Sequence, residues 1–177
     1  AFEVFAFGCI DPVACNYDVF ANTDDGSCLY LDIFGICGGD STVQMAIDSA
    51  STGDTINIPL GIYAESLTIH KSIVLLAGAG ATLDVSGYQT GISILQNVTD
   101  VTINGLTISG DAVTYSGITV NPGATNITLT NNTIKNILLP TGNPSNSSPL
   151  SYGILCWGDA NPVNPPTNIT ISNNNIS

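Results

Sequence analysis

The sequence has almost no positive charge. It contains no arginine, two lysines and one histidine against 14 acidic residues, and its formal net charge is −12. Binding to nucleic acids and anionic membranes depends on Lys and Arg side chains that neutralise phosphates. The composition therefore argues against these partners and favours divalent cations.

Long apolar runs are also missing. No stretch approaches the roughly 18 apolar residues of a membrane-spanning helix, and no charged-then-apolar leader precedes Ala1. We therefore expect no membrane insertion and interpret the chain as a mature secreted protein.

The residues that are present divide the chain unevenly. Nine of the 14 carboxylates lie between Glu3 and Asp54, and the other five are spread over the much longer remainder. Ile, Thr, Asn, Val, Leu and Gly dominate that remainder, and this composition suits strands and turns. The sequence therefore predicts a short N-terminal strand at residues 1–7, an acidic module at residues 8–40 and a mainly β domain at residues 41–177.

Four of the five cysteines lie in the acidic module: Cys9, Cys15, Cys28 and Cys37. Close spacing in a loop-rich acidic segment is typical of an extracellular disulfide framework. Zinc is the alternative, but zinc sites usually show C-x-x-C pairs or added histidines, and the single histidine, His70, lies elsewhere. We therefore favour disulfides and a secreted, cell-surface location.

The acidic module also carries candidate calcium ligands: Asp11, Asn16, Asp18, Asn22, Asp24 and Asp25. Calcium takes six to eight oxygen ligands around a tight turn, and crowded carboxylates repel each other unless a cation intervenes. The alternative is that these are turn residues that bond to their own backbone. The EF-hand spacing is not kept, because Gly26 comes one place early and no glutamate follows.

The segment GCIDPVACNYDVFANTDDGSC, followed by FGICGGD, resembles the repeat GC(T)DPxACNYxxxAxxDDGSC of secreted surface proteins of marine bacteria. It is also loosely similar to the calcium-binding repeats of thrombospondin type 3. The matching residues are Cys9, Asp11, Pro12, Asn16, Tyr17, Ala21, Asp24, Asp25, Gly26 and Cys28. The resemblance implies that Cys9 pairs with Cys28 and Cys15 with Cys37, because two-cysteine versions of the repeat keep only the first pair.

A helical stripe opens the β-rich region. Its apolar residues are Val43, Met45, Ala46, Ile47 and Ala50. Ser41 or Thr42 is suited to be the N-cap, which predicts one helix of about ten residues. A strand over residues 55–58 should follow.

Internal repetition predicts a solenoid. Gly91-Ile-Ser-Ile94 aligns with Gly117-Ile-Thr-Val120 and Gly153-Ile-Leu-Cys156. The first two copies are 26 positions apart, and this interval is the turn length where no insertion intervenes. Alternating Ile, Val and Leu would stack inside a parallel β-coil. Cys156 falls in the inward column, so we expect it to be a core residue.

Two further columns have a defined meaning. Gly105, Asn131 and Asn173 share one column, and these residue types tolerate a left-handed backbone, so we expect a tight bend there. Asn132 and Asn174 share the next column, in which buried asparagines would form a hydrogen-bonded ladder.

The stretch GDTINIPLGIYAESLTIHKSIVLLAG resembles the beginning of pectin-lyase-like β-helices, GDTIxVxxGxYxExLxIxKxIxLxG. The matching residues are Gly53, Asp54, Thr55, Ile56, Gly61, Tyr63, Glu65, Leu67, Ile69, Lys71, Ile73, Leu75 and Gly78. The resemblance implies a right-handed, single-stranded parallel β-helix whose first helix caps the end of the core.

The resemblance does not extend to an active site. Lyases of this architecture use Arg or Lys as the base with a calcium ion, and the related hydrolases use paired aspartates with His and Arg. Residues 41–177 contain no arginine, no adjacent acidic pair, and only Lys71, Lys135 and His70, which we expect at the surface. We therefore predict that the protein is not an enzyme.

Two function classes remain. The first is a secreted structural or adhesive protein stabilised by calcium, whose partners at the Ser177 end are copies of itself or further β-helix turns. The segment of residues 1–7 would add as a strand to a neighbour. The alternative is a glycan-binding or degenerate polysaccharide-cleaving module. There, Tyr152 and Trp157, beside insertions at residues 138–151 and 158–167, would stack on sugar rings unless they pack under the loops.

Overall fold

The computed structural model describes residues 5–39, 41–138, 151–158 and 164–177. It divides into two compact units, residues 1–42 and residues 43–177, which we call the N-terminal unit and the coil unit. Most of the two predicted insertions lies outside the described residues. Each unit is described by itself.

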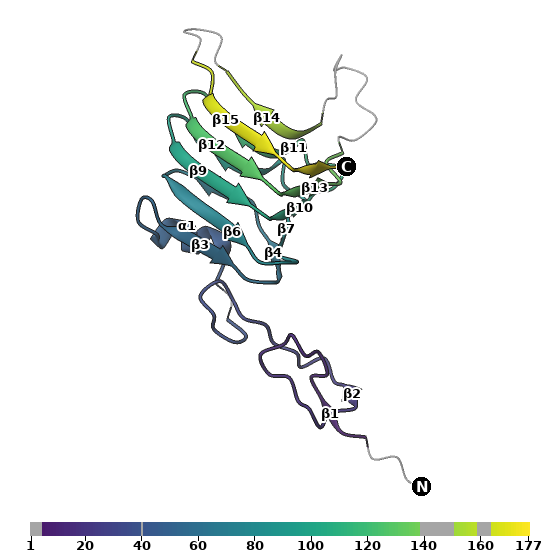
Figure 1. The fold of residues 1–177 in the computed structure, drawn as a ribbon. Helices are drawn as coiled ribbons and strands as arrows, with labels where there is room; N and C mark the ends of the chain where they lie inside the picture. Colours follow the sequence, from purple (N-terminus) through teal and green to yellow (C-terminus); the bar gives the residue numbers. More distant parts are fainter. Residues whose placement is uncertain (1–4, 40, 139–150, 159–163) are drawn as a thin grey trace. The chain divides into compact units, whose positions relative to one another are not determined.

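Three parallel sheets make up the coil unit, and the chain visits them in turn before returning to the first one layer further along (Figure 1). The strand orders are β15-β12-β9-β6-β3, β16-β13-β10-β7-β4 and β14-β11-β8-β5. The strands are β3 Thr55–Ile58, β4 Ile62–Ala64, β5 Leu67–Ile69, β6 Ile73–Ala77, β7 Thr82–Asp84, β8 Thr90–Ile94, β9 Thr99–Asn104, β10 Thr107–Ser109, β11 Ser116–Val120, β12 Thr125–Thr130, β13 Thr133–Lys135, β14 Tyr152–Cys156, β15 Thr167–Ser172 and β16 Asn175–Ile176. This mainly β, parallel arrangement is compatible with the predicted β-helix.

The register follows the predicted repeat. Thr90 of β8 pairs with Ser116 of β11, 26 positions later, and β9 and β10 pair with β12 and β13 at the same interval. The final coil is longer, because its insertions set Ile127 opposite Ile169. The predicted column of Ile94, Val120 and Cys156 is present in the same register.

Burial alternates along each strand in the way that stacks the aliphatic columns inside. Val101 and Ile103 of β9 are buried, as are Ile127 and Leu129 of β12, whereas Thr102 between the first two is half-buried. β-branched residues favour the extended backbone, and alternation places every second side chain in the core. The core of the coil unit is therefore a stack of aliphatic rows.

Residues with a left-handed backbone recur in columns near the ends of the strands. Gly105, Asn131 and Asn173 have φ values of 81°, 55° and 55°, which confirms the predicted bend. A second column was not predicted: Asp100, Asn126 and Asn168 have φ values of 57°, 56° and 53°. Asp and Asn tolerate this region better than other non-glycine residues. The signal was available, since each of these residues directly precedes an aligned Val or Ile.

The helix α1 spans Val43–Ser49, which is shorter than the sequence predicted. Val43, Ala46 and Ile47 are buried, whereas Met45 of the predicted stripe is exposed. α1 contacts β3 and β5 of the first coil, and Figure 1 shows it beside β3.

Lys71 is half-buried and binds the C-terminal end of this helix. Its Nζ donates to the carbonyl oxygens of Asp48 at 3.0 Å and Ala50 at 2.8 Å, a role that the sequence did not predict for this lysine. Carbonyls in the last turn of a helix lack partners within the helix, and a cation there stabilises them. His70 is exposed, as expected, with Nδ1 at 3.9 Å from Asp48 Oδ1.

The N-terminal unit contains little regular structure. It holds the two-residue strands β1 Phe7–Gly8 and β2 Thr23–Asp24, which are parallel, and an isolated bridge between Leu31 and Cys37. The Ala6 carbonyl also accepts the amides of Asn22 and Thr23. The described end of the segment 1–7 thus pairs with residues 22–24 of its own unit.

Cys156 is exposed, so its expected burial was wrong. The predicted alignment of Cys156 with Ile94 and Val120 is correct, but the predicted burial is not. Ile94 and Val120 are covered by a following coil, whereas β14 is the edge strand of its sheet. Burial in a stack requires coils on both sides, and column membership alone does not supply them.

Candidate functional site

Four of the predicted calcium ligands use an oxygen to hold their own turn. Asp11, Asp18, Asp24 and Asp25 each accept, through Oδ1, the backbone N–H of the residue two positions later, at 2.9 to 3.0 Å. This is the Asx turn, in which the side chain replaces a backbone acceptor. The arrangement matches the turn interpretation of these carboxylates.

The two predicted amide ligands hold separate segments together. Asn16 Oδ1 accepts the Leu29 amide at 2.7 Å, and its Nδ2 donates to the Ser27 carbonyl at 2.6 Å. Asn22 Oδ1 accepts the Ala6 amide at 3.0 Å. Both side chains therefore act as structural bridges.

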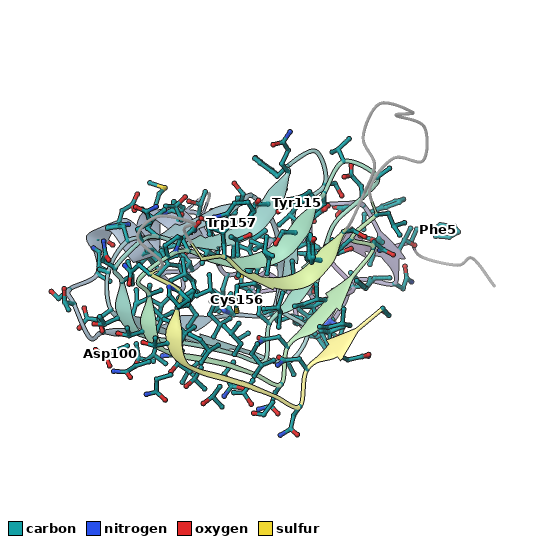
Figure 2. The ribbon with its side chains drawn as sticks, turned by 90° about the horizontal axis from the view of Figure 1, so that it is seen from above. Phe5, Asp100, Tyr115, Cys156 and Trp157 are labelled. Carbon is teal, nitrogen blue, oxygen red and sulfur yellow. A yellow bond between two sulfur atoms is a disulfide. The ribbon has the colours of Figure 1, made fainter. Side chains whose placement is uncertain are left out.

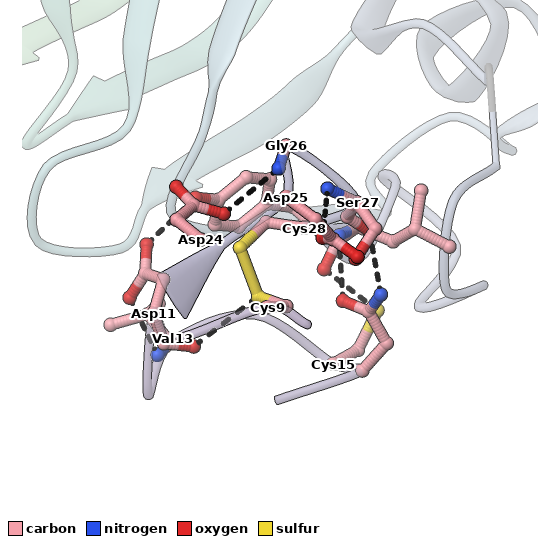
Figure 3. The surroundings of a disulfide bond; sticks show 12 residues. Cys9, Asp11, Val13, Cys15, Asp24, Asp25, Gly26, Ser27 and Cys28 are labelled. Carbon is pink, nitrogen blue, oxygen red and sulfur yellow. Dashed lines mark hydrogen bonds between the residues drawn. A yellow bond between two sulfur atoms is a disulfide. The ribbon is translucent and has the colours of Figure 1, made fainter. Parts of the chain in front are cut away.

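Tyr30 interacts with two of the predicted calcium ligands, Asp11 and Asp24. The Tyr30 hydroxyl donates to Asp11 Oδ2 at 2.7 Å, and this bond, with that from the Val13 amide, lowers the pKa of Asp11. The same bond raises the pKa of Tyr30, helped by the charges of Asp11 and Asp24. Figure 3 shows both aspartates on one side of the Cys9–Cys28 disulfide.

The six predicted calcium ligands all lie in the turns and bridges just described. Calcium requires six to eight oxygens, yet no cluster of three or more His, Cys, Asp or Glu able to hold a metal ion occurs among the described residues. Asp24 and Asp25 lie in overlapping turns, and the Tyr30 hydroxyl is hydrogen-bonded to Asp11. Calcium binding therefore stays a prediction that rests on charge and resemblance.

Asp32 is a buried carboxylate that the sequence did not single out. Its Oδ1 accepts the amides of Phe34 at 2.9 Å and Ile36 at 2.8 Å. These bonds, that from Ile36 first, lower the pKa of Asp32. It is thus a turn-forming residue of the N-terminal unit like the other aspartates.

Two disulfides cross the N-terminal unit: Cys9–Cys28, shown in Figure 3, and Cys15–Cys37. This is the pairing that the resemblance implied. Their Cα atoms lie 4.7 Å and 5.8 Å apart, within the usual range for a disulfide. Because the unit buries few large side chains, these crosslinks and the Asx turns are its main constraints.

Tyr152 and Trp157, the predicted sugar-stacking residues, do not form one platform. Tyr152 packs edge-on against Tyr115, with ring centroids 5.7 Å apart. Trp157, labelled in Figure 2, directly follows β14, whose first residue is Tyr152, and is 51% exposed. Of the two, only Trp157 presents an open aromatic ring.

Glu65 is a further residue whose role the sequence did not show. Oε1 and Oε2 accept the amides of Val43 at 2.7 Å and Gln44 at 3.0 Å, at the start of α1. These are two of the donors that a helix leaves without internal partners. Glu65 matched the pectin-lyase-like pattern, but nothing in its spacing indicated a capping role.

Comparison with known protein families, curated proteins and solved structures gives no match for this chain. Both sequence resemblances therefore stay predictions. In the described part of the chain, no helix has both the length and the apolar character needed to cross a bilayer.

Proposed function

We propose that the protein is a secreted structural or adhesive component of a cell surface, whose coil stack is lengthened by further β-helix turns or by copies of itself. The observation that carries this proposal is the open side of the last coil. Ile171 and Ile176 are 48% and 53% exposed, whereas Leu129 and Ile134, one coil earlier in the same columns, are 0% exposed. Unpaired strand edges beside exposed apolar side chains favour pairing with another strand.

The proposal includes the finer features of the fold. Parallel strands joined by crossovers are almost always right-handed, which supports a right-handed β-helix. The contacts of α1 with β3 and β5 support its role as a cap on the first coil. The disulfides support secretion, because they persist in oxidising environments.

The proposal also holds that the protein is not an enzyme. In the coil unit, Lys71 is bound to helix carbonyls and Glu65 to helix amides. Asp84 and Asp111 accept hydrogen bonds from the amides of Ser86 and Val113, two positions after each. These contacts support this part of the proposal, because each of the four side chains is bonded to the backbone.

Calcium on the N-terminal unit is a separate part of the proposal. Its support is the net charge of −12 and the concentration of carboxylates between Glu3 and Asp54. A bound cation would reduce their repulsion and stiffen the turns. The ligands named from the sequence remain Asp11, Asn16, Asp18, Asn22, Asp24 and Asp25.

Light scattering and thermal unfolding of the purified chain, with calcium and with a chelator, test the proposal. We expect molar mass to rise with protein concentration and chelation to lower the unfolding temperature of the N-terminal unit. A strict monomer with the same unfolding curve in both conditions would rule out both parts. Association that chelation does not alter would retain the assembly and remove calcium.

Glycan binding is the second candidate function, and the exposed ring of Trp157 favours it. An open indole face can stack on a sugar ring. A polysaccharide binding screen should then show retention that Trp157→Ala abolishes and Tyr152→Phe leaves unchanged, since Phe keeps the ring that packs on Tyr115. A blank screen with the unmodified chain would exclude this function.

A further inference from the structure

Asn132 and Asn174 bind the preceding coil in the same way. Asn132 Oδ1 accepts the Leu106 amide at 3.0 Å, and its Nδ2 donates to the Ile103 carbonyl at 3.0 Å. Asn174 Oδ1 accepts the Asn132 amide at 2.9 Å, and its Nδ2 donates to the Leu129 carbonyl at 2.8 Å. Each asparagine side chain therefore accepts the backbone N–H of the residue that occupies its own column in the preceding coil. It also donates to the backbone C=O three positions before that residue.

The backbone fixes the orientation of these side chains. An N–H can only donate and a C=O can only accept, so each amide must present Oδ1 to the first group and Nδ2 to the second. By the same register, the N–H of Asn174 and the C=O of Ile171 face the open side of the last coil. No acceptor for the Asn174 N–H is found within the described ranges.

The column of Asp100, Asn126 and Asn168 has side-chain hydrogen bonds in the same direction, each donated to the preceding coil. Asn126 Nδ2 donates to Asp100 Oδ1 at 2.9 Å, and Asn168 Nδ2 donates to Asn126 Oδ1. Asp100, at the edge of the coil unit in Figure 2, sets the direction, because an ionised carboxylate only accepts. By the same pattern, Asn168 Oδ1 would accept a hydrogen bond from a donor in the following coil.

We infer that the open side of the β14–β15–β16 coil is a docking surface for a parallel β-coil that carries asparagine in the Asn174 column and a side-chain donor in the Asn168 column. Such a coil continues the contact already made between β12 and β15, and it pairs the Asn174 N–H and the Ile171 C=O. It also covers Ile171 and Ile176, which are exposed. This inference rests on the proposed function, because it names the kind of coil that lengthens the stack.

The chain supplies its own probe. The segment 110–135 forms one complete turn of the coil without an insertion, and Lys135 corresponds in register to Ser177. A copy of this segment joined after Ser177 would therefore place its copy of Asn132 in the Asn174 column and its copy of Asn126 in the Asn168 column. The matched control carries Asn132→Leu in the added copy only, because Leu106 is the native residue of that column one coil earlier.

Amide hydrogen exchange by NMR and thermal unfolding then compare the two extended proteins. We expect the unmodified copy to slow exchange of the Asn174 amide by about tenfold more than the Asn132→Leu copy, since one buried hydrogen bond is worth about that factor. We also expect the higher unfolding temperature with the unmodified copy. A third extension with Asn131→Gly in the copy should behave like the unmodified one, because Gly105 occupies that column natively.

Two results would overturn the inference. If neither extension slows exchange in β15, the surface does not accept a coil. If the Asn132→Leu copy protects the Asn174 amide and stabilises the coil unit equally, the surface does not select asparagine. Both readouts are intramolecular, so they are independent of whether the unextended chain assembles, which light scattering measures separately.

Discussion

Asn174 Oδ1 accepts two hydrogen bonds from Asn132, one from its backbone N–H at 2.9 Å and one from its Nδ2 at 3.0 Å, although the residues are 42 positions apart. Asn132 is 1% exposed and is paired on both of its sides. The ladder thus satisfies polar groups that the aliphatic core would otherwise leave unpaired.

Asn132→Leu should destabilise the coil unit by about 2–4 kcal/mol, because the buried Leu106 N–H and Ile103 C=O lose their partner. Asn131→Gly is the control and should change stability by less than about 1 kcal/mol, since glycine adopts the positive φ freely. Urea unfolding followed by circular dichroism measures both. Equal midpoints for Asn132→Leu and the unmodified chain would show that the ladder contributes nothing.

Glu65→Ala should loosen the start of α1 at a cost of about 1 kcal/mol, the usual effect of losing an N-terminal cap. Faster amide exchange at Val43 and Gln44 is the specific signature, because these two donors lose their acceptor. Glu65→Gln keeps one carbonyl oxygen and should have a smaller effect at one of the two amides. Unchanged exchange at both positions in Glu65→Ala would contradict the capping role.

The double replacement Cys9→Ser, Cys28→Ser should destabilise the N-terminal unit by about 3 kcal/mol, from the loss of a crosslink across a loop of this length. Limited proteolysis should then cut within residues 8–40 while the β signal of the coil unit remains. Cys156→Ser is the matched control and should leave the cleavage rate unchanged. A double replacement that stays as resistant as the parent would show that the turns alone hold this unit.

The pairing of Asp11 with Tyr30 predicts a two-sided pH dependence. The pKa of Asp11 is lowered from 3.8, so its contribution is present above that value and is lost as the pH falls through the folded-state pKa. The pKa of Tyr30 is raised from 10.0, so its contribution is complete below that value and is lost as the pH rises through the folded-state pKa. The N-terminal unit should therefore be most stable between these limits.

Tyr30→Phe tests this assignment by NMR titration of the carboxyl groups. The pKa of Asp11 should move up toward its ordinary value, since the largest cause of its shift is removed. The pKa of Asp25 should not move, because its shift comes from the Ser27 hydroxyl and amide. Movement of both, or of neither, would show that Tyr30 does not act on Asp11 through a direct bond.

The coil register is the part of the structure most fully predictable from sequence. Each turn repeats the same environment, so Gly91, Gly117 and Gly153 could be aligned without knowing any contact. Asn131 and Asn173 indicated a left-handed bend because few other residues tolerate it. The calcium ligands were harder, because the Asp and Asn side chains that suit calcium also suit the turns in which the structure places them.

The sequence by itself determined which side chains stack and where the backbone turns, because both follow from a repeat and from local conformational preference. Only the tertiary structure decided how each stacked residue is surrounded. It exposed Cys156 at a sheet edge, placed Lys71 on the carbonyls of α1 and gave the helix amides to Glu65. These outcomes depend on neighbours in another coil or far along the chain, such as Ala50 for Lys71 and Val43 for Glu65, and no local pattern records them.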